Sequence, residues 1–578
     1  MAGEFIVEGK NKDALFSLTA YRGDGMSLLA MNWKKGKPAE DFVGFAIEYK
    51  EPGGTKFFAL KNRVSFPGVD GALNPNSLST RLSPIQKFRW VHFPRNAELP
   101  GKFMYQVTPV FMNAADELSY GEPQTAALEL RRETYPKQLN VTFTRGFVSS
   151  QAFVDKFGKD AIPTLLPAKA DRGLNFVASH PRAAEALAWM GFEARSAILE
   201  VLDEAINDNG AEVRAVVYDL NEPGIVTRLE KLGKRLKIII DDDGEHGKPS
   251  SGETQAAKRL IKSAGKENVK RQHLGKLQHN KTIVVDGPRV KAAVCGSTNH
   301  SWRGFFVQNN NAIILRGQRP VEIFRAAFED YWANDAVGGF GKTGSATWND
   351  LKLDSIDGQI GFSPRSTKNA VLKSIADDIE TTQSSLFFSL AFLYQTPGAI
   401  QNAIKKVKKA DGVFSYGISD HEVKGLNGKT ASGIQLQKPN GKVTLVQPAA
   451  LTSGVPLPFK AEPTGGGGTR MHHKFVVIDF DKPTARVYMG SYNFSTAADT
   501  QNGENLLLIR DRRVAVSYVL EALRIFDHYH FRVAQQEAKT AKKKLQLSKP
   551  PRKTGERPWW HADYTDGRKI LDRELFCH

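Results

Sequence analysis

The sequence predicts a mixed α/β protein built from two similar halves, with an all-β sandwich in front of them. Three observations predict this architecture. Short apolar runs separated by Gly, Pro and Asn turn signals fill the first 135 residues. Strands and amphipathic helices then alternate. A set of polar motifs in this α/β region recurs about 193 residues further along the chain.

These patterns divide the chain into five segments. A length of 578 residues with 41% hydrophobic residues is enough to bury several cores. We expect a β-sandwich over 1–135, a connector over 136–174, a first α/β half over 175–340, a second half over 341–535 and a basic C-terminal extension over 536–578.

The expected sandwich is read from runs such as "MSLLAMNW", "DFVGFAIEYKE" and "KFMYQVTPVF", with turn signals such as "EPGG" between them. Trp33, Tyr49 and Tyr105 lie on three of these runs, and this placement resembles fibronectin type III domains. We expect the three aromatic residues to be core residues, and the module to position or recruit rather than to catalyse.

The α/β region begins with "GLNFVASHP", which is followed by an amphipathic helical stretch and the strands "AEVRAVVYDL" and "LKIIIDDD". A glycine-rich break at 337–350 separates the halves. Beyond the break, "GQIGFSPR" parallels "GLNFVASHP", and a helix and the strand "SLFFSLAF" follow. We therefore expect each half to begin with one of these two matching segments.

The net charge of +18 favours a polyanionic partner. Basic residues concentrate in two runs, 258–276 and 539–557, and we expect the second to be an extended tether. No apolar stretch approaches the roughly 20 residues that span a bilayer, and the first residues do not resemble an export signal. Two distant cysteines, Cys295 and Cys577, favour a reducing, cytoplasmic setting.

The recurring motifs form three clusters that keep one spacing. The offset is 193 residues in the first cluster and 194 in the other two, which indicates an internal duplication. In the order first half then second half, the pairs are His279 and His472, Lys281 and Lys474, Asp286 and Asp479, Ser297 and Ser491, Asn299 and Asn493, and Asn310 and Glu504.

Strand geometry indicates which of these side chains act together. Residues two apart on a strand point to the same face, so each histidine projects with its lysine, and each serine with its asparagine. Asp286 lies an odd number of residues from His279, so it is expected to be a structural anchor. If the halves pack about a pseudo-twofold axis, two imidazoles, two ammonium groups and two carboxamides surround one cavity.

Such a cavity suits a phosphodiester. Lysine and asparagine side chains can neutralise and bind its non-bridging oxygens, while one histidine attacks phosphorus and the other protonates the leaving oxygen. Glu504 is expected to raise the pKa of the imidazole that it touches and so to distinguish the two histidines. The sequence leaves open which histidine that is, and Asn310 takes the corresponding place in the other half.

The duplicated H-x-K-x-x-x-x-D motif with G-S-x-N downstream resembles the phospholipase D superfamily. The resemblance covers roughly residues 175–533 and implies a phosphodiesterase that needs no metal or other cofactor and works through a phosphohistidine. It also implies that His279 is the nucleophile and His472 the general acid. The spacing from each aspartate to the following Gly-Ser is longer than the commonest pattern of the family, and Asn310 replaces an expected carboxylate.

Three functions remain open at this point. The basic charge and the second motif "GSYNFSTAADTQNGEN", which resembles the bacterial endonuclease branch, favour a nuclease. A phospholipase D or transphosphatidylase is the alternative, since basic surfaces also suit anionic lipid. The third is a phosphate-binding scaffold without turnover. The sequence does not indicate the oligomeric state.

Four other features receive structural interpretations. We expect "DDDGEHG" at 241–247 to be a solvated loop rather than a metal site, and His528 and His530 to be packing residues. Trp559 and Trp560 are expected to dock onto the protein rather than to stack on bases. The glycine-rich loop at 453–470 is a candidate gate.

Overall fold

The computed structural model describes residues 4–67, 78–94, 96–130, 133–146, 153, 156–158, 161–420, 423, 434–437, 443–446, 471–540 and 545–577. The chain separates into two compact units. The first combines residues 1–134, 437–444 and 516–578, and the second combines 135–436 and 445–515. The candidate gate at 453–470 lies outside the described residues.

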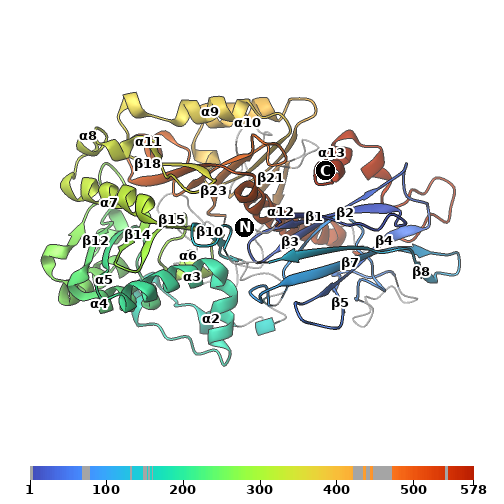
Figure 1. Ribbon diagram of the computed structural model, residues 1–578, viewed down its shortest axis with the longest axis horizontal. Coiled ribbons are helices and arrows are strands. Elements are labelled where there is room, and N and C mark those ends of the chain that lie inside the picture. Colours follow the sequence, from blue (N-terminus) through green and yellow to red (C-terminus); the bar gives the residue numbers. More distant parts are fainter. Residues whose placement is uncertain are drawn as a thin grey trace. The chain divides into compact units, whose positions relative to one another are not determined.

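The N-terminal part of the first unit is all β (Figure 1). One antiparallel sheet has the order β1 (Ile6–Glu8), β2 (Phe16–Arg22), β3 (Ser27–Trp33) and β6 (Arg89–His92). The other has the order β5 (Phe58–Ala59), β4 (Phe42–Lys50), β7 (Lys102–Met112) and β8 (Leu118–Tyr120), and β9 (Gln124–Glu129) also pairs with β7.

Alternating residues of the two sheets build one shared core. Phe16 and Leu18 from β2 pack in the same cluster as Phe45 from β4 and Tyr105 from β7. Trp33 and Tyr49 belong to this cluster as well, so the expectation that the three aromatic residues are core is confirmed. Two sheets around a common core form a sandwich, as the sequence predicts.

The C-terminal residues complete the sandwich core. Trp560 is 2% exposed within the core, and the Trp559 ring stacks on Phe88 with 5.2 Å between centroids. Tyr21 donates its hydroxyl to the Phe576 carbonyl at 2.9 Å, beside the helix α13 (Gly567–Leu575). The expectation that the tryptophans dock onto the protein is confirmed. The basic run at 539–557 contacts the sandwich at Lys549, which pairs with Asp116 at 2.8 Å.

The second unit contains two mixed sheets. The first has the order β10 (Leu139–Phe143), β16 (Asn311–Arg316), β15 (Lys291–Gly296), β14 (Lys281–Asp286), β11 (Glu212–Val217), β12 (Leu236–Ile240) and β13 (Val269–Arg271). The second has the order β17 (Asn349–Asp350), β18 (Asp357–Ser363), β25 (Glu504–Arg510), β24 (Arg486–Gly490), β23 (Lys474–Ile478), β19 (Ser385–Leu390), β20 (Phe414–Ser419), β21 (Ile434–Gln437) and β22 (Val443–Val446).

Six neighbouring strands correspond between the sheets. In each, four antiparallel pairings are followed by one parallel pairing, β11 with β12 in the first sheet and β19 with β20 in the second. The register matches too, because Val217 pairs with Lys281 and Leu390 pairs with Lys474. The predicted pair of pseudo-symmetric α/β halves is therefore confirmed.

The predicted start of the first half is wrong. Residues 173–181, "GLNFVASHP", form the end of a 3-10 turn and irregular chain, not a strand. The strand equivalent to β18 is β10, which lies within the predicted connector and pairs with β16 as β18 pairs with β25. The Gly and Pro residues that flank "GLNFVASHP" imitate strand boundaries, whereas β10 is only five residues long and gives a weak periodic signal.

Helices cover the sheets (Figure 1). In the first half, α3 (Ala183–Asn207), α4 (Pro223–Leu232) and α5 (Gly252–Ala264) share one core with alternate residues of the sheet, and α7 (Gln318–Ala333) packs on β14 and β15. In the second half, α9 (Leu372–Glu380) and α10 (Ala399–Val407) pack on β19 and β23. The remaining described α-helices are α2 (Ile162–Leu165), α6 (Trp302–Phe306), α8 (Val337–Phe340), α11 (Thr496–Thr500) and α12 (Arg512–Thr540).

Local chemistry explains where the helices near the site begin. Ser251 accepts the Thr254 N–H at the start of α5, and Ser301 does the same for Gly304 at the start of α6. The predicted packing role of His528 and His530 fits their place in α12, where both are partly buried. Among the described helices, none combines the length and apolarity needed to cross a bilayer.

We expect Trp560→Ala to destabilise the first unit by about 3 to 5 kcal/mol, because it removes a fully buried aromatic side chain from the sandwich core. Urea unfolding followed by circular dichroism measures the change. Phe58→Ala, at a site that is 54% exposed, is the control and should change stability by less than about 0.5 kcal/mol. Equal effects of the two substitutions would show that the C-terminal residues do not contribute to the core.

Candidate active site

The two predicted histidines meet between the halves of the second unit. His279 directly precedes Asn280 and β14, and His472 has the same place before β23. The centroids of the two imidazole rings are 6.4 Å apart, and the rings are 4% and 0% exposed. The structure thus brings the paired motifs together into one enclosed site.

Each imidazole is hydrogen bonded by a residue of the opposite half. His279 Nδ1 lies 2.8 Å from Glu504 Oε2, and His472 Nδ1 lies 2.7 Å from Asn310 Oδ1. Asn310 donates its amide N–H to the Gly304 carbonyl at 2.9 Å, so its oxygen faces the imidazole and accepts a proton from Nδ1. The contact that the sequence left open is therefore His279 with Glu504.

The lysines are held beside the histidines by main-chain contacts. Lys281 donates to the His279 carbonyl at 2.5 Å, and Lys474 donates to the His472 carbonyl at 2.7 Å. An aromatic ring supports each ammonium group, Tyr218 at 4.7 Å and Phe392 at 5.2 Å from the ring centroids. Sequence reasoning missed these rings, although both follow the strands β11 and β19 that adjoin the motif strands.

The serines and asparagines of the second motif cluster have different surroundings. Ser297 donates to Asn310 Oδ1 at 3.0 Å, and Ser491 lowers the pKa of Glu504 through a hydrogen bond, so both serines support the residues that hold the histidines. Asn299 is fully buried, and among the described residues neither amide atom of its side chain has a hydrogen-bond partner. Asn493 Oδ1 likewise lacks one, which leaves polar atoms available for a ligand.

The two motif aspartates bind elsewhere. Asp286 pairs with Lys291 and with Arg325, at 2.7 Å for the second contact. Asp479 accepts main-chain N–H groups just before β19, from Gln383 at 3.0 Å and Ser384 at 2.8 Å. These contacts are those of structural anchors.

Burial controls the protonation of the site. It raises the pKa of Glu504 to about 8, although Lys281 and Lys474 oppose the shift. Burial and the same two lysines hold the pKa of His279 and of His472 well below the usual range. The net pKa of His279 is therefore low despite its contact with Glu504, because loss of solvent and two nearby ammonium groups outweigh one carboxyl group that itself resists ionisation. That Glu504 distinguishes the two histidines stays a prediction.

Two aspartates that sequence reasoning missed fix the main chain before each histidine. Asp241 accepts the N–H of Gln278 at 2.6 Å, and Asp420 accepts the N–H of Met471 at 3.0 Å. Both follow equivalent strands, β12 and β20. An aspartate directly after a buried strand is the available signal, but the two are not separated by the 193-residue offset, because the connections of the halves differ in length.

"DDDGEHG" at 241–247 is only in part the solvated loop that we expected. Asp241 is 0% and His246 9% exposed, and the His246 ring lies between Asp241 at 2.8 Å and Asp219 at 3.0 Å. The other residues are partly exposed (242 and 243) or exposed (244, 245 and 247). The charge pattern failed as a guide at Asp241 and His246, because these two side chains are buried.

A pocket opens beside Asn493. It has a volume of about 450 Å³, and apolar and polar side chains line it in nearly equal number, with Lys276 and Asn502 among the polar ones. Phe392, Ile400 and Phe494 form part of its wall. No periodic pattern in the sequence indicates this pocket, because its lining comes from segments that are far apart in the chain.

Several known proteins are similar to parts of this chain. A phospholipase D from Rickettsia prowazekii (strain Madrid E) is 46% identical over 48 residues, which are 8% of this chain and 22% of the relative, and one from Rickettsia conorii (strain ATCC VR-613 / Malish 7) is 44% identical over the same length and shares. The chain therefore spans about a fifth of the length of these curated relatives.

Solved structures are similar at a coarser level. Phosphatidylserine synthase from Haemophilus influenzae Rd KW20 matches with a TM-score of 0.39 and 12% identity, over 67% of this chain and 91% of that one. Nuc, a phospholipase D family member from Salmonella typhimurium, matches with a TM-score of 0.20 and 26% identity, over 24% of this chain and 87% of that one.

The family model described as "Cardiolipin synthase, PLD-like domain" matches residues 192–332 and 375–527. These two stretches make up just over half of the chain, and each carries one copy of the paired histidine and lysine. The chain therefore belongs to the phospholipase D-like family.

Proposed function

We propose that this protein is a phosphodiesterase that forms a covalent phosphohistidine on His279, and that its substrate is a nucleic acid. One observation carries the mechanism: two buried imidazoles face one site, and each has its Nδ1 occupied by an acceptor from the other half. The Nδ1 contact orients each ring, so Nε2 is the atom that takes part in the reaction.

The two imidazoles have unequal acceptors, and this inequality supports different roles. When His279 Nε2 attacks phosphorus, the ring gains positive charge, and a Glu504 carboxylate at Nδ1 stabilises that charge. His472 faces only a neutral amide, and Lys474 and Lys281 destabilise its protonated form, so it gives up a proton readily. His279 is therefore the nucleophile and His472 the general acid.

The reaction has two balanced steps. In the first, a bond forms between His279 Nε2 and phosphorus, the bond to the leaving oxygen breaks, and His472 gives that oxygen its proton. In the second, water attacks phosphorus, His472 takes the proton, and the phosphorus–nitrogen bond breaks. Lys281, Lys474, Asn299 and Asn493 bind the non-bridging oxygens, and no metal ion or cofactor takes part.

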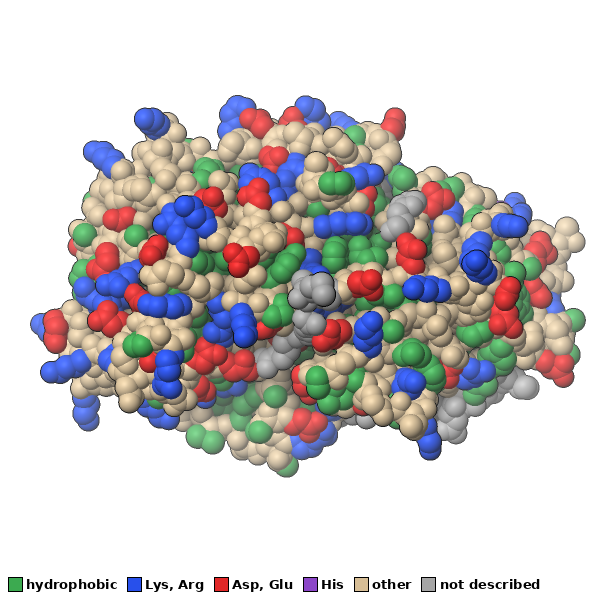
Figure 2. Space-filling view, in the orientation of Figure 1, with side chains coloured by type: hydrophobic (Ala, Val, Ile, Leu, Met, Phe, Trp, Pro, Cys, Tyr) green, Lys and Arg blue, Asp and Glu red, His purple; other side chains and the backbone are tan. Residues whose placement is uncertain are grey.

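Charge favours nucleic acid as the substrate. The net charge is +18, and the helix α5 exposes Lys258 and Lys262, which lie one turn apart, with Lys266 just beyond its end. Arg259 and Arg271, by contrast, are bound within the protein, so only part of this basic run can meet a polyanion. Figure 2 shows basic and acidic side chains interspersed on the face drawn, so no single patch decides the substrate.

A glycerophospholipid is the second candidate. The apolar side chains of the pocket beside Asn493 would suit an acyl chain, and the short matches to proteins named phospholipase D point the same way. In either case, we propose that the fibronectin type III-like sandwich recruits or positions the substrate. A cytoplasmic setting fits the two free cysteines, Cys295 and Cys577.

The roles of the histidines can be tested with a p-nitrophenyl phosphodiester, because its leaving group needs no proton. We expect His472→Asn to release about one p-nitrophenolate per chain in a burst and then to stall as a covalent phosphoenzyme, since water is no longer deprotonated. Mass spectrometry of the quenched protein detects the adduct. His279→Asn is the matched control and should give neither burst nor adduct, and the reverse result would exchange the two roles.

The pH dependence tests the contact between His279 and Glu504. The nucleophile needs the unprotonated form of this pair, so kcat/KM should fall as the pH drops through about 8, where Glu504 takes up a proton. The charged groups around the pair are Lys281, Lys474, Asp219 and His246.

In Glu504→Gln this proton site is absent, so the acidic limb of the profile should move to lower pH. The plateau should drop roughly 10- to 100-fold, since a charge-assisted hydrogen bond of about 1.5 to 3 kcal/mol is lost. A pH profile of kcat/KM with the p-nitrophenyl substrate measures both changes. An acidic limb at the same pH in Glu504→Gln would exclude Glu504 as its source.

The substrate class is tested by incubating the protein with plasmid DNA, single-stranded DNA, RNA and phosphatidylcholine vesicles, with EDTA present. We expect cleavage of nucleic acid that His279→Asn abolishes, so contaminating nucleases are excluded. Hydrolysis of the lipid alone would contradict the nucleic-acid proposal and support the second candidate. No turnover of any substrate by the intact protein would favour a phosphate-binding scaffold.

A further inference from the structure

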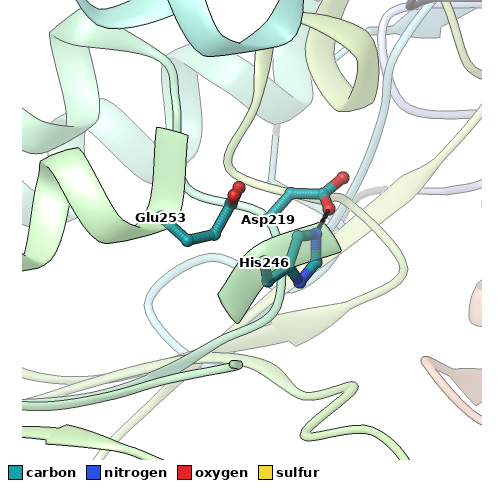
Figure 3. A group of neighbouring side chains, drawn as sticks. All are labelled: Asp219, His246 and Glu253. Carbon is teal, nitrogen blue, oxygen red and sulfur yellow. Dashed lines mark ion pairs between the residues drawn. The ribbon is translucent and has the colours of Figure 1, made fainter. Parts of the chain in front are cut away.

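A second polar cluster lies close enough to His279 to act on it electrostatically. Its members are Asp219, which follows β11, His246 in the 3-10 turn η4 (Gly244–Gly247), and Glu253 in the first turn of α5. Figure 3 shows the three side chains converging from these separate elements, with the ion pair between Asp219 and His246 drawn. One ligand atom from each lies within 4.8 Å of the others.

The contacts of His246 leave one ring nitrogen for this cluster. Asp241 can only accept at His246 Nδ1, 2.8 Å away, so this nitrogen carries a proton. Nε2 lies 3.0 Å from Asp219 Oδ1, where either a proton or a metal ion can join the two atoms. Two donor atoms that share a metal ion at about 2.1 Å lie roughly 3.0 to 3.4 Å apart, and a carboxylate on the far nitrogen of a ligating histidine is a common arrangement.

Glu253 is the second, independent observation. Its side chain is 4% exposed, and its carboxylate accepts the Leu220 N–H at 3.0 Å. Within the part of the chain that the structure describes, no Lys, Arg or His nitrogen forms an ion pair with it. This buried carboxylate therefore has no direct ion pair, and the nearby His246 and Arg271 act on it only through space.

Three largely buried carboxylates, Asp219, Asp241 and Glu253, surround the His246 ring. Lys281 and Arg303 act on Asp219 electrostatically, and Arg271 acts on Glu253 in the same way. The hydrogen bonds of Arg271 go instead to the main-chain carbonyls of residues 241 and 246 and to the Thr254 hydroxyl. A divalent ion would add positive charge at the point where the three ligand atoms converge.

The second half lacks the corresponding ligand. The strand register places Phe392 at the position equivalent to Asp219, because Val217 and Leu390 both pair with the lysine of their motif. The two halves share the histidines, lysines and supporting aspartates, so the cluster is not required for the shared chemistry. It is a feature of the first half alone.

We propose that Asp219, His246 and Glu253 bind one divalent transition-metal ion, Zn²⁺ or Mn²⁺, which stiffens the chain that carries His279. An imidazole with two carboxylates suits these ions better than Mg²⁺ or Ca²⁺, which prefer oxygen ligands alone. The effect reaches His279 through Asp241, which holds both the His246 ring and the Gln278 N–H. The ion is structural, and it takes no part in phosphoryl transfer.

Metal content and stability test this site without any assay of activity. The full-length protein is stripped with a chelator, titrated with Zn²⁺ or Mn²⁺, and analysed by inductively coupled plasma mass spectrometry and thermal unfolding. We expect one ion per chain and a higher Tm with the ion bound, since a ligand that binds only the folded state stabilises it. Glu253→Gln, which keeps an oxygen for the Leu220 N–H, should weaken binding at least 10-fold, and His246→Ala should abolish it.

His273→Ala is the matched control, because His273 is an exposed histidine close in sequence that pairs with Asp242 at 2.8 Å. This variant should bind one ion as the unaltered protein does. Equal binding by His246→Ala, Glu253→Gln and His273→Ala, or no binding by the unaltered protein, would overturn the proposal. A protein that cannot bind the ion but forms the phosphoenzyme refutes only the metal site, and a protein that binds the ion but forms no phosphoenzyme refutes only the phosphohistidine.

Discussion

Each of the two imidazoles is hydrogen bonded by a residue of the opposite half, and the rest of the site depends on this constraint. A strand positions His279, but the acceptor that selects its tautomer, Glu504, comes from the other sheet. Neither half can therefore complete its own imidazole. The main chain reinforces this arrangement next to the motifs, where Gly503 donates to the Leu277 carbonyl at 2.8 Å and His472 donates to the Asn309 carbonyl at 3.2 Å. Assembly of the halves and assembly of the site are one event.

The duplication gives the two halves the same geometry, and the differences between the halves give the two histidines different surroundings. Two identical halves would place equal acceptors at the two imidazoles, and the proton would have no preferred partner. Asn310 places a neutral amide at His472, whereas Glu504 places a carboxyl group at His279. This single side-chain difference gives the two imidazoles unequal acceptors. Burial then matters more than the identity of the acceptor, because it holds the pKa of both histidines low while it raises that of Glu504. A bound phosphodiester would offset the charge of Lys281 and Lys474 and so favour protonation of a histidine only when substrate is present.

Features that repeat between the halves could be predicted from the sequence, and features that do not repeat could not. The motif pairs were found because duplication preserves their spacing, and the two-half fold followed from them. The start of the first half was misplaced because β10 and β18 are separated from their motifs by connections of different length, so no constant offset marks them. The same reason hid Asp241 and Asp420, which hold equivalent main-chain atoms but do not share the offset of the motifs. The partner of Glu504 was unpredictable in principle, since it depends on how the two sheets face one another.

The departures from symmetry also indicate where to look for specificity. In the proposed reaction, positions that match between the halves serve the phosphoryl group, which is itself nearly symmetric about its non-bridging oxygens. The two substituents of a phosphodiester differ, and so do the surroundings on the two sides of the site. On one side, Phe392 and Phe494 line the pocket beside Asn493. On the other, the equivalent positions are Asp219 and His300, and His300 is a buried imidazole whose ring nitrogens have no partner among the described residues. The two sides of the site therefore differ most at residues that lie outside the motifs, where symmetry between the halves is not kept.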